Sequence, residues 1–378
     1  MDGNRPKLLF LITEDWYFCS HRLPLACAAR DAGFEVSVAT RVRSHGEKIT
    51  AAGLHLIPLG LQRSGRNPWR ELVAIGEIAR IYRKIAPDIV HHVAMKPVLY
   101  GSLAAKIAGV PGIVNALAGM GYVFTSSKLS AKLLRPLITL ALRFLLKNGR
   151  VILQNPDDRA ALIAAGVLKA EQVRLIRGSG VDTALFRFSP EPGSEYAPPL
   201  VVLPARMLWD KGVGEFVAAA QQLKRDGVNA RFVLAGERDP DNPADIPLEQ
   251  LQAWHDSGDV EWRGKQEDMP ALLAQANIVC LPSYREGLPK ALLEAASSGR
   301  AIVATDVPGC REAVHHNENG LLVPARDASA LAAALRLLIE NPPLRRQFGQ
   351  RGREMAEQEF SVKKITAETL ALYRELLP

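Results

Sequence analysis

Short runs of apolar residues alternate with longer amphipathic segments along almost the whole chain. In the first half, runs rich in Val, Ile and Leu predict strands over residues 8–13, 36–39, 55–58, 89–92, 113–116 and 151–154. In the second half, the same pattern predicts strands over residues 201–205, 232–235, 260–262, 278–281, 301–304 and 321–323. Helix-length segments separate these strands, which is typical of right-handed βαβ units in parallel sheets. The sequence therefore predicts an α/β protein.

The strand pattern occurs in two similar halves, which predicts two Rossmann-like domains. A chain of 378 residues is long for one hydrophobic core and sufficient for two. The segment 188–199 is rich in Pro and Gly and predicts the linker between the domains. We therefore expect a first domain over residues 1–180 and a second domain over residues 190–360.

The composition limits the classes of protein that need to be considered. Charged residues make up 23% of the chain and hydrophobic residues 48%, which are values of a globular protein. The 4 cysteines form no C-x-x-C pair, which favours reduced thiols in a cytosolic protein. The first residues show no signal-peptide pattern, and no apolar stretch approaches the ~20 residues of a spanning helix. We therefore expect a cytoplasmic protein.

The net charge of +7 is unevenly distributed along the chain. Residues 1–180 contain 25 lysines and arginines against 12 acidic residues, whereas the remainder contains 22 against 28. No acidic residue lies between Asp88 and Asp157. This basic first half indicates an anionic partner, which could be nucleic acid, an anionic lipid or a phosphorylated substrate.

The segment from Glu286 to Glu294 combines two carboxylates with the start of a helix. Glu286 lies in the loop after a predicted strand, and the loop continues through Gly287, Leu288 and Pro289. Pro289 suits the first helical position, because its missing N–H would have no partner there. Free backbone N–H groups at this helix start would bind phosphate, while the carboxylates would bind sugar and ribose hydroxyls. The alternative interpretation is an ordinary helix start with a solvated glutamate.

Two cations follow another predicted strand, over residues 201–205. Arg206 and Lys211 leave the carboxyl end of this strand, where α/β folds bind ligands. Their charges would offset the charge of a diphosphate leaving group. The next strand ends at Gly236, where the backbone must approach a neighbour or a ligand closely.

In this order along the chain, Arg206, Lys211, Gly236, Glu286 and Glu294 resemble the donor site of the retaining glycosyltransferases of family 4. The resemblance covers the whole chain and implies the GT-B fold, in which two Rossmann-like domains face a central cleft. It implies a metal-independent hexosyltransferase with a UDP-sugar as donor substrate and no cofactor. It also implies that the final helix, 362–378, crosses back to the first domain.

The resemblance assigns roles in the second domain, which would bind the nucleotide sugar. The residues expected to be catalytic are Arg206, Lys211 and Glu286. The residues expected to bind the donor are Gly236, Gly287, Leu288, Pro289 and Glu294. The segment Gly180-Val-Asp182, followed by Phe186, resembles the hinge of the same family.

The stretches 205–216 and 235–243 narrow the resemblance to a subgroup. They are similar to the N,N'-diacetylbacillosaminyl-diphospho-undecaprenol N-acetylgalactosaminyltransferases. This subgroup extends sugars linked to undecaprenyl diphosphate during the assembly of bacterial surface glycans, lipopolysaccharide and glycoprotein glycans. The likeness implies UDP-N-acetylgalactosamine or UDP-galactose as the donor and a polyprenyl-diphosphate-linked sugar as the acceptor, which the first domain would bind.

Three stretches of the first domain are candidates for acceptor binding. His21 and Arg22 lie after the first strand, in a loop that is expected to face the cleft, and Lys96 lies after the fourth strand. Gly119 and Gly121 offer backbone to a sugar. For His21 and Arg22, a helix cap and a surface cation are an equally good interpretation.

The histidines of the first domain give no catalytic residue. Many members of family 4 carry a His in the loop that here covers residues 115–121, and this chain has none there. We interpret His91 and His92 as residues at a strand end.

A basic amphipathic helix is predicted over residues 127–148. Its cations recur every three or four positions and form one stripe, with Leu, Ile and Phe around the rest. The candidate membrane contacts are Lys128, Lys132, Arg135, Arg143 and Lys147. One interpretation is a helix that binds the anionic inner face of the cytoplasmic membrane, which would make the protein peripheral there. The other is a core helix with a solvated basic face.

Two other functions remain open. A nonhydrolysing UDP-sugar epimerase shares the fold and would convert a nucleotide sugar without an acceptor. A nucleic-acid-binding protein would use the basic first domain, but the charges lack interleaved aromatic residues and a binding motif, so we expect no nucleic-acid partner. The sequence Asp239-Pro-Asp241 is similar to the metal site of another glycosyltransferase fold; we interpret it as a turn and expect no metal.

Overall fold

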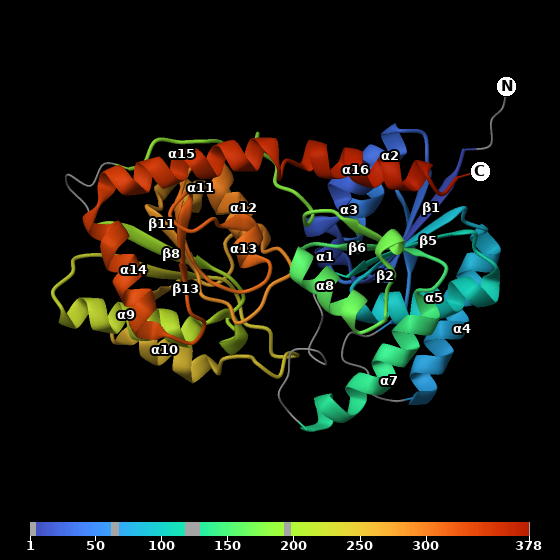
Figure 1. Cartoon of the computed structure of the whole chain (residues 1–378), viewed down its shortest axis with the longest axis horizontal. Helices are drawn as coiled ribbons and strands as arrows, with labels where there is room; N and C mark the ends of the chain where they lie inside the picture. Colours follow the sequence, from blue (N-terminus) through green and yellow to red (C-terminus); the bar gives the residue numbers. More distant parts are fainter. Residues whose placement is uncertain (1–4, 62–67, 118–128, 193–197, 378) are drawn as a thin grey trace. The chain divides into compact units, whose positions relative to one another are not determined.

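The computed structural model describes residues 5–61, 68–117, 129–192 and 198–377 (Figure 1). The chain forms two compact units, one of residues Met1–Ser179 with Val362–Pro378 and one of residues Gly180–Ser361. Each unit is built on a parallel sheet with helices on both faces. The predicted α/β fold with two Rossmann-like units is confirmed.

The sheet of the first unit has 7 strands in the order β3-β2-β1-β4-β5-β6-β7, and its neighbouring strands pair in parallel. The strands are β1 Lys7–Glu14, β2 Glu35–Arg41, β3 His55–Pro58, β4 Ile89–Val93, β5 Gly112–Leu117, β6 Arg150–Leu153 and β7 Val173–Leu175. All six strands predicted in this half are present. The edge strand β7 was not predicted, because a run of 3 residues carries too little periodicity to identify.

The helices of the first unit divide between the two faces of its sheet. They are α1 Asp15–His21, α2 Leu23–Asp31, α3 Gly46–Ala51, α4 Pro68–Ile85, α5 Met95–Ala108, α7 Leu129–Leu145, α8 Pro156–Ala164 and α16 Val362–Arg374. One apolar core joins the sheet to α1, α2 and α16, and another joins it to α4 and α5. The C-terminal helix α16 packs against α2 within this unit.

The sheet of the second unit has 6 strands in the order β10-β9-β8-β11-β12-β13. The strands are β8 Leu200–Pro204, β9 Arg231–Ala235, β10 Glu261–Trp262, β11 Ile278–Leu281, β12 Ala301–Thr305 and β13 Gly320–Val323, all of which were predicted. From β8 the chain adds β9 and β10 on one side and then returns to add β11 on the other. The loops that follow β8 and β11 therefore diverge at a topological switch point, where α/β sheets bind ligands.

The helices of the second unit also cover both faces of its sheet. They are α9 Val213–Arg225, α10 Leu248–Asp256, α11 Met269–Gln275, α12 Lys290–Ser297, α13 Cys310–Ala313, α14 Ala328–Glu340 and α15 Pro342–Gln358. One core contains residues of α9, α10 and α14, and another contains residues of α12, α13 and α15. No helix in the described part of either unit is long and apolar enough to cross a bilayer.

The predicted linker is part of the second unit. The chain passes from one unit to the other after Ser179 and again after Ser361, so the segment 188–199 does not separate the units. The described part of this segment is held by two buried arginines: Arg300 donates to the Ser189 carbonyl, and Arg345 pairs with Glu191. A Pro- and Gly-rich composition indicates an irregular segment, but it cannot distinguish a linker from a loop that packs on its own domain.

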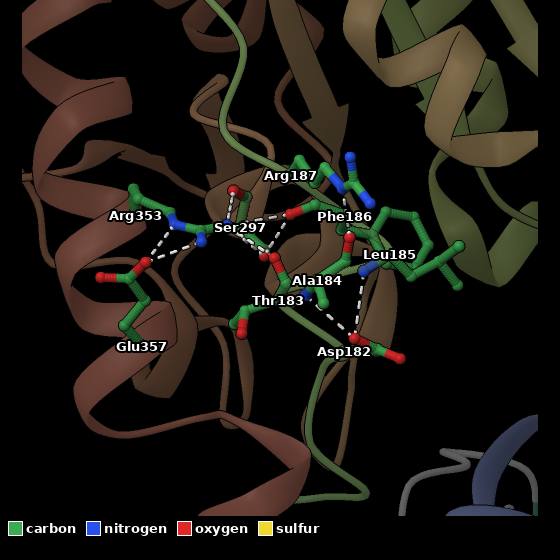
Figure 2. Close-up of polar contacts among 9 residues, drawn as sticks. All are labelled: Asp182, Thr183, Ala184, Leu185, Phe186, Arg187, Ser297, Arg353 and Glu357. Carbon is green, nitrogen blue, oxygen red and sulfur yellow. Dashed lines mark hydrogen bonds and ion pairs between the residues drawn. The ribbon is translucent and has the colours of Figure 1, made fainter.

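The segment 182–187 is fixed to the second unit by hydrogen bonds (Figure 2). The Asp182 carboxylate accepts bonds from the N–H groups of Ala184 at 2.9 Å and Leu185 at 3.0 Å. Arg353, on α15, donates to the carbonyls of Thr183 at 3.2 Å and Phe186 at 3.0 Å, and to the Ser297 carbonyl at 2.8 Å. One guanidinium therefore joins this segment to α12 and α15.

We expect Arg353→Ala to destabilise the protein by about 2–4 kcal/mol, because it leaves several carbonyls of a largely buried site without their donor. Urea denaturation measures the free energy of unfolding. Arg351→Ala is the matched control on the same helix: Arg351 is 42% exposed and pairs with Glu318 and Glu354, so its loss should cost under about 1 kcal/mol. Equal losses in the two variants would contradict the stabilising role of Arg353.

Candidate functional site

The second unit gathers the predicted donor residues at the carboxyl ends of neighbouring strands. Arg206 and Lys211 follow β8, Gly236 follows β9 and Glu286 follows β11. Because β8 pairs with both β9 and β11, the three loops lie side by side at the switch point. The structure therefore brings together residues that are separated by up to 80 positions in the sequence.

A short turn fixes Lys211 next to the loop that follows β11. Lys211 ends a single 3₁₀ turn, Trp209–Lys211, and Gly212 reverses the chain with φ +71°. A Cβ atom at Gly212 would lie 2.1 Å from the Pro282 carbonyl oxygen, so only glycine fits this approach. The Tyr284 N–H donates to the Asp210 carbonyl at 2.9 Å and ties the two loops together.

Both predicted cations form ion pairs with carboxylates. The Lys211 ammonium donates to Glu286 Oε1, and the Arg206 guanidinium donates to Asp239 Oδ2. The side chains are only partly accessible, with 23% exposure for Lys211 and 12% for Glu286. Each cation is thus held at the strand ends by one carboxylate, and its remaining N–H donors can bind a further anion.

The close approach predicted at Gly236 is observed. A Cβ atom there would lie 1.8 Å from the Ala205 carbonyl oxygen, which no side chain allows. The Trp262 indole N–H donates to the Gly236 carbonyl at 2.9 Å and holds the turn after β9. Gly236 therefore allows the β9 loop to lie against the residue that precedes Arg206.

The start of α12 differs from the prediction by one position. Pro289 is the N-cap, with φ −73° and ψ 116°, and the helix begins at Lys290. The fixed φ of proline, about −65°, fits both a cap position and the first helical turn, so the sequence does not fix this boundary to one residue. The cap contributes no side-chain hydrogen bond, so the first N–H groups of α12 keep their capacity to bind an anion.

The loop before α12 is supported by the loop that follows β12, at the N-cap of α13. Gly309, with φ +82°, lies so close to the Gly287 carbonyl oxygen that a Cβ atom would approach it within 2.3 Å. Leu288 is 9% exposed and anchors the loop in the core. Glu286 is thereby held on a rigid backbone rather than on a free loop.

Glu294 lies one turn into α12 and is largely buried. Burial raises the pKa of its carboxyl, and the ammonium of Lys290, 3.0 Å away at the i−4 position, acts against this increase. A buried carboxylate with a single cation next to it retains acceptor capacity for hydroxyl groups. This site can therefore hold a ribose, while the cations and N–H groups hold a diphosphate.

In the first unit, the segment around His21 and Arg22 is helical and not the predicted loop. Helix α1 begins directly after β1 and ends at His21, which stacks on Tyr17 with ring centroids 4.1 Å apart. Arg22 is not a surface cation, because it is only 5% exposed between α1 and α2. Apolar and aromatic residues such as Phe18 and Tyr17 continue the helical pattern after the strand, a signal that the prediction of a loop overlooked.

A small hollow of the first unit is lined by Arg22, His91, Ser179 and Thr369. Burial lowers the pKa of the Arg22 guanidinium. Among the residues that the structure describes, Arg22 Nε and His91 Nε2 have no hydrogen-bond partner. This hollow thus contains a buried cation whose Nε–H has no acceptor, while its Nη1 donates to the His21 carbonyl at 3.5 Å.

His91 and His92 are buried on β4 and have structural partners, as predicted for strand residues. His91 Nδ1 is hydrogen-bonded to the Tyr373 hydroxyl of α16, and His92 Nδ1 lies 2.7 Å from Asn115 Oδ1. Burial lowers the pKa of His92 to about 4, so this ring is neutral at pH 7. Asn115 lies inside β5 and not in the predicted loop.

Lys96 is the second residue of α5, and its ammonium pairs with the Glu71 carboxylate of α4 at 2.8 Å. Two residues earlier, Ala94 has φ 76°, a strained value for a residue with a Cβ atom. Such strain occurs at functional sites more often than elsewhere, which keeps Lys96 a candidate.

Three of the remaining predicted residues, Gly119, Gly121 and Lys128, lie outside the described residues. Lys132, Arg135 and Arg143 lie on α7, as predicted, and Arg143 is exposed. Lys147 is also exposed, but it lies two residues beyond the end of the helix at Leu145.

The sequence interpretation missed two partners of the donor residues. Lys290 was detectable from its i, i+4 spacing to Glu294. Asp239 was interpreted as part of a turn, and the Asn242 N–H does donate to the Asp239 carbonyl at 2.8 Å, but the carboxylate also binds Arg206. That pairing could have been inferred from the adjacency of β8 and β9, whose carboxyl ends meet at one edge.

Known proteins share both the sequence pattern and the fold. The family described as Glycosyl transferases group 1 matches residues 187–355, and the family described as Glycosyl transferase 4-like matches residues 7–155. The chain is 30% identical over 367 residues to the N,N'-diacetylbacillosaminyl-diphospho-undecaprenol alpha-1,3-N-acetylgalactosaminyltransferase of Campylobacter jejuni, covering 94% of this chain and 95% of that protein.

Two solved structures show the same fold. The sucrose-phosphate synthase of Thermosynechococcus elongatus superimposes with a TM-score of 0.80 at 22% identity, covering 98% of this chain and 99% of that one. Anabaena HepE in complex with UDP and glucose superimposes with a TM-score of 0.77 at 21% identity, covering 97% and 99%.

Two parallel-sheet units with this site define a GT-B glycosyltransferase that uses a nucleotide sugar. The chain belongs to the family-4-type glycosyltransferases, so the family, fold and enzyme class predicted from the sequence are confirmed.

Proposed function

We propose that this glycosyltransferase moves a hexose or N-acetylhexosamine from a UDP-sugar to a sugar linked to a polyprenyl diphosphate, in the assembly of a bacterial surface or glycoprotein glycan. The observation that carries the proposal is the cluster of Lys211, Glu286, Arg206 and Glu294 at the switch point of the second unit. N-acetylgalactosamine and galactose are the favoured sugars, since the Campylobacter relative transfers the former, as its name states.

The donor site supports this proposal through its charges. Arg206 and Lys211 bind the diphosphate, and the free N–H groups of α12 add donors to the same anion. Glu294 holds the ribose, because it lies deeper in the helix, and Glu286 contacts the donor sugar, because it precedes the helix. Glu286 also keeps Lys211 in place until the diphosphate arrives.

The reaction proceeds with retention and yields an α-glycoside. The bond between the anomeric carbon and the diphosphate oxygen breaks, and its electron pair stays on UDP. The acceptor hydroxyl oxygen bonds to the same carbon on the same face, and its proton passes to the leaving phosphate. Lys211 and Arg206 offset the negative charge that grows on the diphosphate, which requires no resident metal or cofactor.

The acceptor side rests on the first unit. Arg22 adds a buried cation next to His21 in the hollow of this unit, and Lys96 and the glycines Gly119 and Gly121 remain candidates for phosphate and sugar. A polyprenyl acceptor is confined to a bilayer, so the enzyme acts as a peripheral protein on the anionic inner face of the cytoplasmic membrane. The exposed cations Arg143 of α7 and Lys147, which follows the end of this helix, support such a contact.

The proposal is tested with a panel of nucleotide sugars and a short-chain polyprenyl-diphosphate-linked sugar as acceptor, with the products identified by mass. We expect one added N-acetylhexosamine or hexose from a UDP-sugar, and no loss of activity in EDTA. Conversion of the nucleotide sugar without an acceptor would favour the epimerase instead. Transfer to a soluble sugar that carries no diphosphate, with no transfer to the lipid, would contradict the lipid-linked acceptor.

A further inference from the structure

The most exposed large apolar side chains are concentrated on two helices of the first unit. In the described part of the chain, Trp69 is 78% exposed and Val73 71%, both on α4, while Leu137, Leu140 and Phe144 on α7 are 64% exposed each. A single exposed apolar side chain is ordinary, but a group of them in one region marks an interaction surface. The sequence left open whether the helix at 127–148 is interfacial or a core helix with a solvated basic face, and the exposed apolar residues of α7 favour the interfacial interpretation.

The outer face of helix α4 has an apolar part and a basic part. Trp69, Leu72 and Val73 lie at positions i, i+3 and i+4, and therefore on one face of the first turns. Further along the same face, Arg80, Arg83 and Lys84 are exposed. The inner face, with Ile78 and Tyr82, packs in the core against the sheet.

Helix α7 has a similar outer face. Leu137, Leu140 and Phe144 follow each other at spacings of three and four, so they form one apolar stripe, and Arg143 and Lys147 border it. Leu142 and Leu146 face the core on the opposite side. Interfacial helices show this arrangement, with an apolar stripe beside cations.

Helix α5 connects the two outer faces, because it packs against both α4 and α7 (Figure 1). Arg83 of α4 donates to the Ile107 carbonyl at the end of α5 at 3.3 Å, and the Lys106 ammonium lies 3.8 Å from the centre of the Phe144 ring. Ile107 itself is 49% exposed. The C-terminal end of α5 therefore contacts both α4 and α7.

The charges around this surface identify its partner. The segment between Asp88 and Asp157, which contains α5 and α7, has no acidic residue, and Glu71 of α4 is paired with Lys96. A second copy of the chain docked on the same surface would bring like charges together. An anionic bilayer would bind the cations and also accept the apolar side chains, and Trp is the residue that prefers the boundary between water and lipid.

We propose that α4 and α7 together form a membrane-docking surface, in which Trp69, Leu72, Val73, Leu137, Leu140 and Phe144 enter the headgroup region of an anionic bilayer. The proposal goes beyond the electrostatic contact of α7 alone, since it adds α4 and apolar insertion. It rests on the proposed lipid-linked acceptor for its purpose, but vesicle binding can be measured with no sugar substrate present.

The test compares two double variants, Trp69→Ser/Leu72→Ser on α4 and Leu137→Ser/Leu140→Ser on α7, in sedimentation with vesicles of phosphatidylcholine and about 30% phosphatidylglycerol. Each double variant should lower the partition coefficient by about tenfold or more, because it removes two large apolar contacts with the bilayer. Brominated lipids should quench the tryptophan fluorescence of the wild type much more than that of Trp69→Phe. All substituted side chains are exposed, so the thermal unfolding temperature should be unchanged.

Leu248→Ser/Leu337→Ser is the matched control, because these leucines are 37% and 48% exposed on the second unit. It should bind vesicles as the wild type does. Unchanged binding of the α4 double variant would remove α4 from the surface and overturn the proposal. Light scattering provides a second test. If a double variant changes from dimer to monomer but still binds vesicles, the surface is an interface between two copies of the chain, and the proposal is overturned. Transfer to a detergent-dispersed short-chain acceptor should survive in both double variants; its absence in the wild type would count against the proposed function and not against membrane docking.

Discussion

Lys211→Ala should lower the turnover number by about a hundredfold or more, with a smaller effect on donor affinity. The ammonium of Lys211 lies at the carboxyl end of β8, where the account places the diphosphate. The negative charge on that group increases as the bond to the anomeric carbon breaks, so the cation stabilises the transition state more than the bound donor. Steady-state kinetics on the folded variant separates the two effects.

The variant also leaves Glu286 without its partner, which offers another explanation for lost activity. The double variant Lys211→Ala/Glu286→Gln removes the unpaired charge, and the account predicts no recovery, because both side chains act on the donor. Lys224→Ala is the control, since Lys224 also pairs with a carboxylate, that of Asp259, but lies at the C-terminal end of α9, away from the donor residues. Recovery of turnover in the double variant would show that Lys211 only neutralises Glu286.

Glu294→Ala should weaken the binding of UDP by about tenfold or more, whereas Glu286→Ala should leave it nearly unchanged and impair transfer. The two carboxylates differ in position: Glu294 lies on α12 and Glu286 in the loop that precedes it, although their side chains are about equally accessible, at 13% and 12%. Ribose hydroxyls belong to UDP itself, while the sugar is present only in the full donor. Calorimetry with UDP on each variant measures this difference. Equal losses of UDP affinity in the two variants would contradict the assignment of Glu294 to the ribose and Glu286 to the donor sugar.

The pH dependence of UDP binding provides a check on the same residue. Burial raises the pKa of Glu294, although Lys290 acts against this. The ionised carboxylate is the form that accepts bonds from both ribose hydroxyls. As pH falls, UDP affinity should therefore begin to decrease at a higher pH than an ordinary glutamate would require, and Glu294→Gln should remove this dependence.

Much of the fold was predictable because parallel strands buried on both faces form continuous apolar runs. The runs at residues 278–281 and 55–58 gave strand bounds identical to those of β11 and β3. The donor site was also predictable in outline, since Arg206, Lys211 and Glu286 each follow such a run and strand ends share one edge. Gly212 and Gly236 show why the loops are restricted, because each approaches a carbonyl oxygen too closely for any side chain.

The sequence could not identify features that depend on distant parts of the chain. The pairing of Arg206 with Asp239 and the exposure of Leu137 and Phe144 follow from which elements pack together, and a helical pattern alone cannot tell which apolar face lacks a partner. The linker prediction was wrong for the same reason, because Arg300 and Arg345 hold segment 188–192 from distant positions.

The most direct test of the central claim is the stoichiometry of UDP release against acceptor glycosylation. The enzyme is incubated with a radiolabelled UDP-sugar, with and without the polyprenyl-diphosphate acceptor, and both products are counted. We expect one UDP for each sugar added to the lipid, an α-linkage in the product, and almost no UDP without acceptor. Release of UDP that does not depend on the acceptor, or a nucleotide sugar that is converted in its absence, would contradict it.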